Sequence, residues 1–178
     1  MHIYDIHIKN GEIIDGTGAP KFKSDIVIDK GKIIGIFPPE NADVRDVAEN
    51  HFLSNFKAKK TFDAKNKIIS PGFIDVHTHD DDNVFLDPTM SSKISQGVTT
   101  CIAGNCGISL APFSYKGEVP APIALLGKSE VFRFPRVNDY KEEFNNKPSS
   151  VNLALLTGHS MLRVEAMNGE FDRPASSK

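Results

Sequence analysis

Apolar and polar residues alternate near the start of the chain, as they do in strands with one buried face. Ile6 and Ile8 share one face of a first predicted strand. Asn10-Gly11 comes next, and because these residues readily adopt positive φ angles, we expect a tight hairpin turn with residues 12–15 as the returning strand. The pattern therefore predicts that the chain opens with a small antiparallel sheet.

The same alternation continues after a loop rich in glycine and proline. Residues 25–29 and 32–37 predict a second strand pair around a turn at Lys30-Gly31. Residues 40–60 are polar, and we expect a surface helix or a mobile insertion there. Together these elements predict a small β domain over residues 1–66.

The pattern changes in residues 67–178, where short apolar strands alternate with helical segments. Five elements are expected in the order strand, helix, strand, helix, strand, at residues 73–79, 87–97, 98–104, 139–146 and 151–157. Asp87 is the expected N-cap of the first helix, and Gly97 is its expected C-terminal cap. Residues 108–138 show no clear period and are expected to form a long loop. This order predicts βαβ units around a parallel sheet, and therefore the α/β class.

The strongest chemical signal is His77-Thr78-His79, at the end of the first of these strands. Side chains two residues apart point to the same face of a strand, which sets the two Cα atoms about 6.6 Å apart. Two imidazole nitrogens at that spacing can share one metal ion. Ligand sites of parallel α/β folds also lie at the carboxyl ends of strands. The alternative is a pair of surface histidines without a ligand.

Cys106 follows the second strand of this part, again at a carboxyl end. A thiolate there can bind zinc together with the two histidines, although a small buried side chain is the alternative. Cys101 lies within the strand and is expected in the core. Five extended residues span about 16 Å, whereas a disulfide bridges Cα atoms at most ~7 Å apart. The two cysteines are therefore expected to be reduced.

His159 follows the third strand, so that three successive strands each end near a potential ligand. Such a series is typical of the rim of an active site in a β/α fold. A single histidine after Gly158 is also compatible with a hydrogen bond to a loop. Asp80, Asp81 and Asp82 are expected to cap and solvate their loop rather than bind a metal.

Composition narrows the class of protein. Lys and Arg number 21 against 23 Asp and Glu, a formal net charge of −2, so the basic surplus of a nucleic-acid-binding protein is absent. The sequence shows neither the run of about 20 apolar residues that a membrane helix needs nor the pattern of a signal peptide. We therefore expect a cytoplasmic protein whose partners are neither nucleic acids nor membranes.

Residues 71–112 resemble the N-acyl-D-amino-acid deacylases (D-aminoacylases) of the amidohydrolase superfamily. PGFIDVHTH at residues 71–79 marks the superfamily. SQGVTT at residues 95–100, followed by GNCGISLAP at residues 104–112, is specific to the deacylase branch. Shorter similar stretches lie at residues 5–20, 28–36, 132–135 and 158–163.

The resemblance implies an α/β protein in which a small β-sandwich domain precedes a zinc-bearing β/α (TIM-like) barrel. It implies that His77, His79 and Cys106 bind one or two Zn²⁺ ions. The implied reaction is hydrolysis of an N-acyl-D-amino acid to a carboxylate and a D-amino acid. His159 and Arg163 are candidates for contacts with the metal ligands or with the substrate carboxylate, which a guanidinium matches in shape.

A complete β/α barrel takes about 250 residues and eight strands, whereas residues 67–178 predict three. We therefore expect an incomplete barrel in the N-terminal part of a longer enzyme. The general-base aspartate is then expected beyond Lys178, and the chain alone is expected to be inactive. Two alternatives stay open, namely an amidohydrolase acting on cyclic amides or dipeptides, and a truncated product that only binds a partner. The sequence carries no signal for the oligomeric state.

Overall fold

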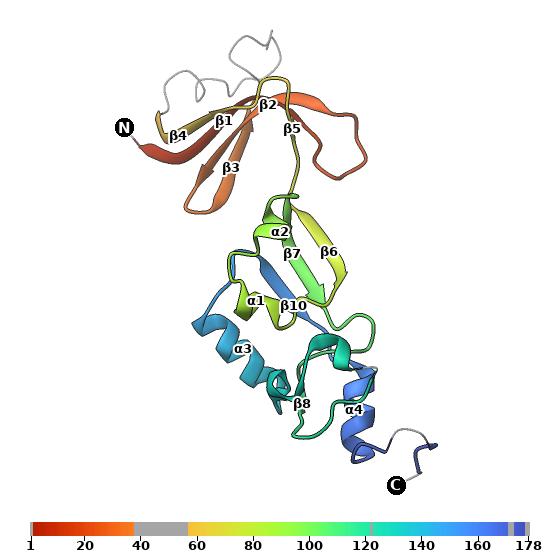
Figure 1. Ribbon diagram of the computed structural model, residues 1–178. Helices are drawn as coiled ribbons and strands as arrows, with labels where there is room; N and C mark the ends of the chain where they lie inside the picture. Colours follow the sequence, from red (N-terminus) through yellow and green to blue (C-terminus); the bar gives the residue numbers. More distant parts are fainter. Residues whose placement is uncertain (1, 38–56, 122, 171–172, 177–178) are drawn as a thin grey trace. The chain divides into compact units, whose positions relative to one another are not determined.

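The computed structural model describes residues 2–37, 57–121, 123–170 and 173–176 (Figure 1). The chain divides into two compact units, Met1–Pro71 and Gly72–Lys178, and each is described by itself. No helix among the described residues is long and apolar enough to cross a membrane.

The first unit is built on one five-stranded sheet. Its strands are β1 (Ile3–Ile13), β2 (Phe22–Asp29), β3 (Lys32–Phe37), β4 (Lys57–Asp63) and β5 (Ile68–Ile69). The order is β3-β2-β1-β4, with β5 also paired to β1. The pairs β1–β2 and β2–β3 are antiparallel, but β4 and β5 run parallel to β1. The antiparallel pairing expected within the first 37 residues is confirmed, but β4 and β5 make the sheet as a whole mixed rather than antiparallel.

Two expected turns in this unit had different outcomes. The turn at Lys30-Gly31 is confirmed, with φ angles of 49° and 72°. The hairpin at Asn10-Gly11 was wrong, because β1 continues through it. Asn10, with its positive φ, instead lies in a bulge between Ile8 and Gly11, where the Asn10 amide donates a hydrogen bond to Asp25 Oδ1 at 2.9 Å.

The polar segment expected as an insertion at residues 40–60 is described only at its end. Residues 40–56 lie outside the described residues. Residues 57–60 begin β4 and pair with β1, so this end is a strand rather than a helix or a mobile insertion.

The second unit contains the predicted parallel sheet. Its strands are β6 (Phe73–Thr78), β7 (Val98–Ala103) and β10 (Asn152–Leu155), in the order β10-β7-β6. Both pairs are parallel, so the α/β class is confirmed. Figure 1 shows the three arrows side by side, with α1 (Asn83–Leu86) and α2 (Ser91–Ile94) connecting β6 to β7.

The helix expected at residues 87–97 is interrupted. Asp87 is not the N-cap of this helix: it ends α1 as its C-cap residue, and its carboxylate accepts hydrogen bonds from the backbone and hydroxyl of Thr89. The helical turn α2 begins after Met90, whose φ of 47° breaks the helical path. Gly97, with φ 79°, ends the following turn as expected.

The described residues of the segment 108–138 are largely irregular, as expected, but they also contribute side chains to the core. They contain the antiparallel pair β8 (Phe113–Ser114) and β9 (Arg133–Phe134) and two short 3₁₀ helices, Ala124–Leu126 and Ser129–Val131. Their buried apolar side chains join the core cluster and are Leu110, Ala111, Phe113, Ile123, Leu126, Phe132 and Phe134. A segment without a clear period predicts a loop, but irregular backbone can also bury its side chains.

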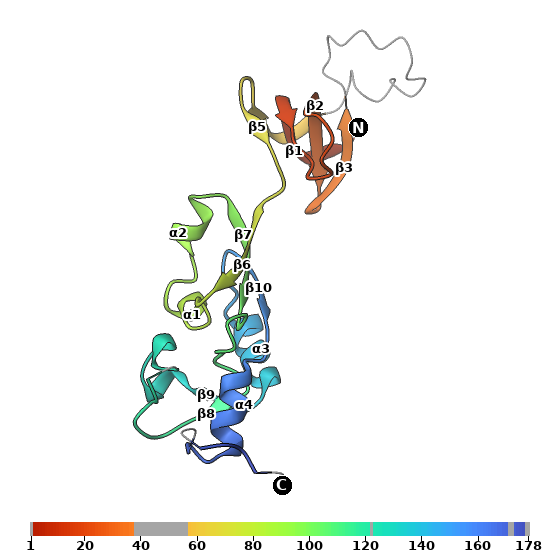
Figure 2. The same cartoon turned by 90° about the vertical axis from the view of Figure 1, so that its right-hand side faces the viewer.

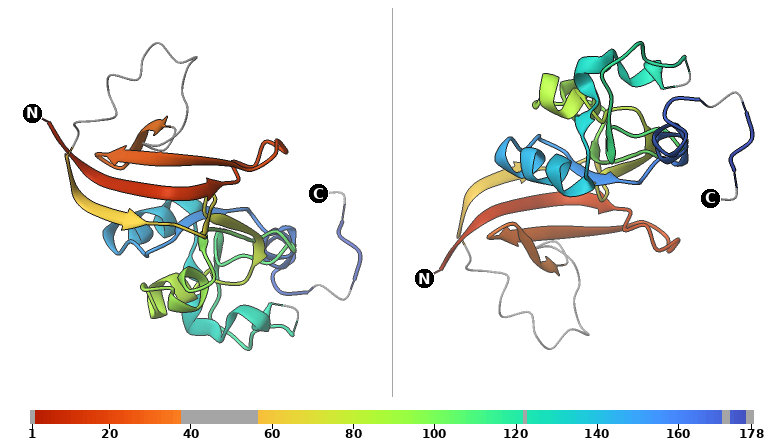
Figure 3. Two further views of the ribbon diagram at one scale, coloured as in Figure 1. Left: turned by 90° about the horizontal axis from the view of Figure 1, so that it is seen from above. Right: turned by 90° about the horizontal axis from the view of Figure 1, so that it is seen from below.

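Two longer helices complete the unit. α3 (Val137–Asn146) precedes β10 as expected, and α4 (His159–Ala166) begins at once after it. α4 is not among the elements expected from the sequence; its residues Met161 and Val164, one turn apart, bury their side chains in the core. β8 lies beside α4 (Figure 2). In the right-hand view of Figure 3, α3 lies across the picture while α4 is seen end-on.

Candidate metal centre

The site lies at the carboxyl ends of two neighbouring strands. His77 belongs to β6, His79 comes directly after it, and Cys106 follows the end of β7. Because β6 and β7 are parallel, their carboxyl ends meet at the same edge of the sheet. The topology thus places Cys106 at the same edge as the two histidines, although it lies 27 residues after His79 in the sequence.

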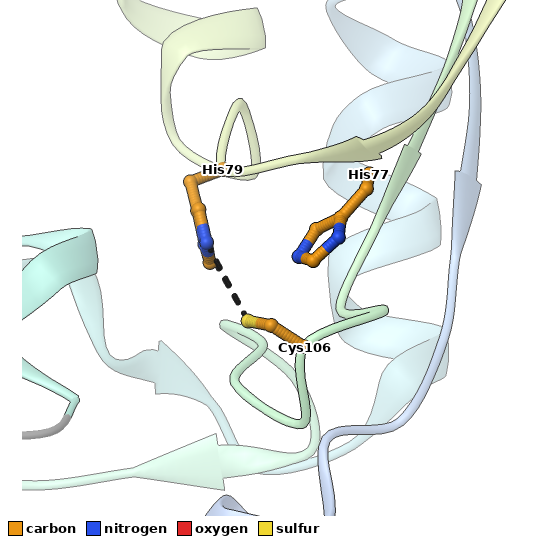
Figure 4. A group of neighbouring side chains, drawn as sticks. All are labelled: His77, His79 and Cys106. Carbon is orange, nitrogen blue, oxygen red and sulfur yellow. Dashed lines mark hydrogen bonds between the residues drawn. The ribbon is translucent and has the colours of Figure 1, made fainter.

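The three side chains converge, as Figure 4 shows. Their potential ligand atoms all lie within 4.8 Å of one another. Cys106 Sγ lies 3.5 Å from His79 Nε2, and the two imidazole centroids are 6.0 Å apart. His77 and Cys106 are exposed and His79 is half-buried, so the ligand atoms are accessible.

The donor set of two imidazoles and one thiol fits zinc. Zn²⁺ takes nitrogen and sulfur ligands in tetrahedral geometry, and catalytic sites keep one position open for water or substrate. Three protein ligands with an exposed side correspond to that type of site.

The backbone that carries the histidines is irregular. Asp75 pairs with Cys101 and Thr78 with Ala103, so β6 advances by three residues where β7 advances by two. This extra residue is a bulge, which changes the face to which the following side chains point. Thr78 is buried while His77 on its amino-terminal side is exposed.

A tight turn holds Cys106. The Gly107 amide donates to the Gly104 carbonyl at 3.1 Å. Gly104 has φ 83°, and a Cβ there would lie 2.1 Å from the Leu156 carbonyl oxygen, so glycine is required. Asn105 Nδ2 donates to the Val76 carbonyl at 2.8 Å, which ties the turn to the strand that carries His77.

Sequence reasoning missed the role of Lys93. Its Nζ lies 2.6 Å from Asp75 Oδ2, 2.9 Å from Asp80 Oδ2 and 3.2 Å from Thr78 Oγ1. Partial burial disfavours its charged form, but the hydrogen bonds to Asp75 and Asp80 outweigh this and raise the pKa of Lys93. The same ion pair lowers the pKa of Asp75. A lone lysine in a predicted helix gives no sequence signal for such contacts.

The acidic run after His79 is not uniformly solvated. Asp81 is fully buried, and its Oδ2 accepts from the Leu110 amide at 3.2 Å. The Tyr140 hydroxyl donates to the Asp81 carbonyl at 2.6 Å. Burial raises the pKa of Asp81 to about 6. The expectation that all three aspartates solvate a loop was therefore wrong for Asp81.

The other two candidate residues are not brought into the cluster. His159 is exposed at the start of α4 and is not part of the metal-ligating group found among the described residues. The Arg163 guanidinium donates to the Arg173 carbonyl at 2.8 Å. The neighbouring backbone does approach the site, because the Ser160 amide donates to the Gly107 carbonyl at 2.9 Å. Cys101 is buried as expected, and both cysteines are free.

Comparison with known proteins identifies the family. The model of the amidohydrolase family matches residues 60–177, more than half of the chain. The chain belongs to the amidohydrolase family.

Its similar relatives include deacylases of D-amino acids. An N-acyl-D-aspartate deacylase of Alcaligenes xylosoxydans xylosoxydans is 38% identical over 164 residues, which cover 92% of this chain and 30% of the relative. A solved D-aminoacylase, described for its binuclear metal centre, is 38% identical with a TM-score of 0.82, covering 98% of this chain and 33% of that one. An N-acyl-D-glutamate deacylase from Bordetella bronchiseptica was solved with zinc and a phosphonate inhibitor. It is 38% identical with a TM-score of 0.79, and the match covers 93% of this chain and 32% of that one. The chain thus spans about a third of the length of these amidohydrolases.

Proposed function

We propose that this amidohydrolase chain is the N-terminal part of a zinc-dependent enzyme that hydrolyses N-acyl-D-amino acids to a carboxylate and a D-amino acid. The observation that carries the proposal is the convergence of His77, His79 and Cys106 within 4.8 Å. The deacylases that share 38% identity with the chain support the same reaction.

In this proposal His77, His79 and Cys106 hold one Zn²⁺, and a second ion is compatible with the binuclear centre of the related D-aminoacylase. A Zn²⁺ ion held by these residues would supply Lewis-acid chemistry at the scissile carbonyl and would help to activate water as the nucleophile. Cys106 binds as the thiolate, so its proton leaves to solvent and metal affinity falls with acid. His159 and Arg163 stay candidates for contacts with the substrate carboxylate or with the metal ligands. The general-base aspartate is proposed to lie outside this chain.

We further propose that the parallel sheet is the beginning of a β/α barrel and that residues 1–66 belong to a small β-sandwich domain, residues 67–178 to the barrel. Supporting this, β6 exposes more than half of the side chains of Phe73, Ile74 and Val76. Parallel sheets are normally covered on both faces, so further elements are expected to pack there. The proposed partner is the small-molecule substrate, and the proposed compartment is the cytoplasm.

The test is hydrolysis of a panel of N-acetyl-D- and N-acetyl-L-amino acids, a hydantoin and a dipeptide by the full-length protein. The native protein and the variants Cys106→Ala and His2→Ala are compared, since His2 is an exposed histidine of the other unit. We expect turnover of D-substrates that Cys106→Ala abolishes and His2→Ala preserves. Turnover of only the hydantoin or the dipeptide would replace the proposed substrate, and unchanged turnover in Cys106→Ala would contradict the ligand assignment.

A further inference from the structure

Lys93 bonds to three points on one short segment of the chain. The segment, residues 75–80, carries both histidines of the proposed metal centre. An ammonium group has three donors and no acceptor. Here the three acceptors within 3.2 Å of Nζ are Asp75 Oδ2, Thr78 Oγ1 and Asp80 Oδ2.

The contacts form a closed network. The Thr78 hydroxyl accepts from Lys93 and donates to Asp80 Oδ2. Asp75 uses its second oxygen to accept from the His77 amide at 3.3 Å. Lys93 is 20% exposed, Asp75 29% and Asp80 15%, so these charges are only partly screened by water.

The network lies where regular strand pairing fails. In an unbroken strand Asp75 and Thr78 would point to opposite faces, because they are an odd number of residues apart. The bulge between them brings both side chains to Lys93. A bulge interrupts the ladder that would otherwise fix the backbone at His77. Here hydrogen bonds from the Lys93 ammonium hold the backbone of residues 75–80 instead.

We propose that Lys93 is a positioning residue of the metal centre, holding residues 75–80 in the bulged form that aims both imidazoles at Cys106. The inference rests on the proposed function, since it takes these three side chains as metal ligands. Without the ammonium, Asp75 and Asp80 are left as two like charges without their shared partner. The loosened segment then presents the histidines in varied positions, which weakens metal binding without removing a ligand.

The test uses Co²⁺ as the probe on the full-length, chelator-treated protein, because its absorption reports the ligands. The thiolate-to-cobalt band reports Cys106, and the visible d–d bands report the coordination geometry. Zinc affinity is then measured by competition against Co²⁺. The variants are Lys93→Met, which removes the charge, and Lys93→Arg, which keeps it. Lys59→Met is the matched control, because Lys59 forms an equally short 2.6 Å pair with Asp5 in the other unit.

We expect Lys93→Met to weaken Co²⁺ and Zn²⁺ binding by about tenfold or more, as changes to groups that orient metal ligands do. We also expect its d–d bands to change. Lys93→Arg should recover much of the affinity, and Lys59→Met should match the native protein. Native affinity and native bands in a folded Lys93→Met variant would overturn the inference.

Two further variants test the positioning role of Lys93 without replacing Lys93 itself. If Lys93→Met does not fold, Asp80→Asn removes one of the two negative charges paired with Lys93, and Thr78→Val removes its hydroxyl acceptor, while both preserve the side-chain shape. Weakened binding in these folded variants supports the inference, and native binding overturns it. Cys106→Ala separates the two proposals, because a thiolate-to-cobalt band that survives this change contradicts the proposed function itself.

Discussion

The two sides of the segment from Asp75 to Asp80 are built differently. On one side Lys93 is bonded to three oxygens at 2.6 to 3.2 Å. On the other side the closest approach of Cys106 Sγ to His79 is a weak 3.5 Å contact, and both His77 and Cys106 are exposed. Short charge-assisted hydrogen bonds select one arrangement, whereas weak contacts leave ligand atoms able to take a partner.

This difference explains how metal ligands can stay exposed while the backbone that carries them is held in place. Around the end of β6, Lys93 and the oxygens that it contacts hold the backbone, whereas His77, His79 and Cys106 would bind the metal. We call the side with His77, His79 and Cys106 the open side and the side bonded to Lys93 the held side. Changes on the open side should act on metal binding. Changes on the held side, or in the turn of Gly104 that carries Cys106, should act on folding as well.

The largest effect is expected for His79→Ala, on the open side. Losing one of three ligands should weaken zinc binding at least a hundredfold, about 3 kcal/mol. The metal-free protein should keep its stability within about 0.5 kcal/mol, because the imidazole makes only weak contacts. Zinc titration and urea unfolding in the presence of a chelator measure the two quantities. Equal free-energy losses in zinc binding and in unfolding would show that the His79 side chain stabilises the fold rather than only binding the metal.

The turn behind Cys106 gives the next largest effect. Gly104→Ala places a Cβ 2.1 Å from the Leu156 carbonyl oxygen at a φ of 83°. We expect a loss of about 3 kcal/mol in the free energy of unfolding, from overpacking and left-handed strain together. Gly16→Ala is a matched control, because Gly16 has the same φ and no atom within 4 Å of its Cβ position. It should lose about 1 kcal/mol, and similar losses in both variants would exclude the Leu156 contact as the cause.

The open side of the site was more predictable from sequence than the held side. His77, His79 and Cys106 follow apolar strands, and the parallel topology alone brings strand ends together. The bulge between Asp75 and Thr78 has no such signal, because it depends on the register of two distant segments.

The acidic run shows why the rest could not be predicted. Three consecutive identical residues enter three environments: Asp80 bonds Lys93, Asp81 is buried, and Asp82 lies 3.6 Å from Arg133. Only the tertiary packing of segments far away in sequence distinguishes them. The hairpin prediction at Asn10 failed for a similar reason, because a positive φ is compatible with a bulge as well as with a turn.

Asp81 provides a test by pH of the core that supports the site. Its pKa rises from 3.8 to about 6 on burial, so between these values the folded protein keeps a proton that the unfolded chain has released. Stability therefore falls as the pH rises through this window, and the penalty is complete above about pH 7. Between pH 4 and 7 this amounts to about 2 kcal/mol. Asp81→Asn lacks the titration, so its stability relative to native should rise by that amount.

Urea unfolding in chelator at a series of pH values measures this difference. Asp63→Asn serves as a control of opposite sign, because the hydrogen bond from Asn10 lowers the pKa of Asp63. That variant should lose stability relative to native as the pH rises through the region up to and around 3.8, where the unfolded carboxyl titrates, so the series extends below pH 4. Parallel pH profiles for native and Asp81→Asn would show that the Asp81 carboxyl is solvated in solution.

The smallest expected effect distinguishes support of the site from support of the fold. Asn105→Ala removes the 2.8 Å hydrogen bond to the Val76 carbonyl, and Asn138→Ala removes a 2.6 Å bond to Glu142 on the surface of α3. Each should cost at most about 1 kcal/mol of stability, because both bonds are exposed. Only Asn105→Ala should also weaken zinc binding, by a few-fold, since Asn105 ties the Cys106 turn to the strand of His77. Equal zinc affinity in the two variants would mean that Gly104 and the turn alone position the thiolate.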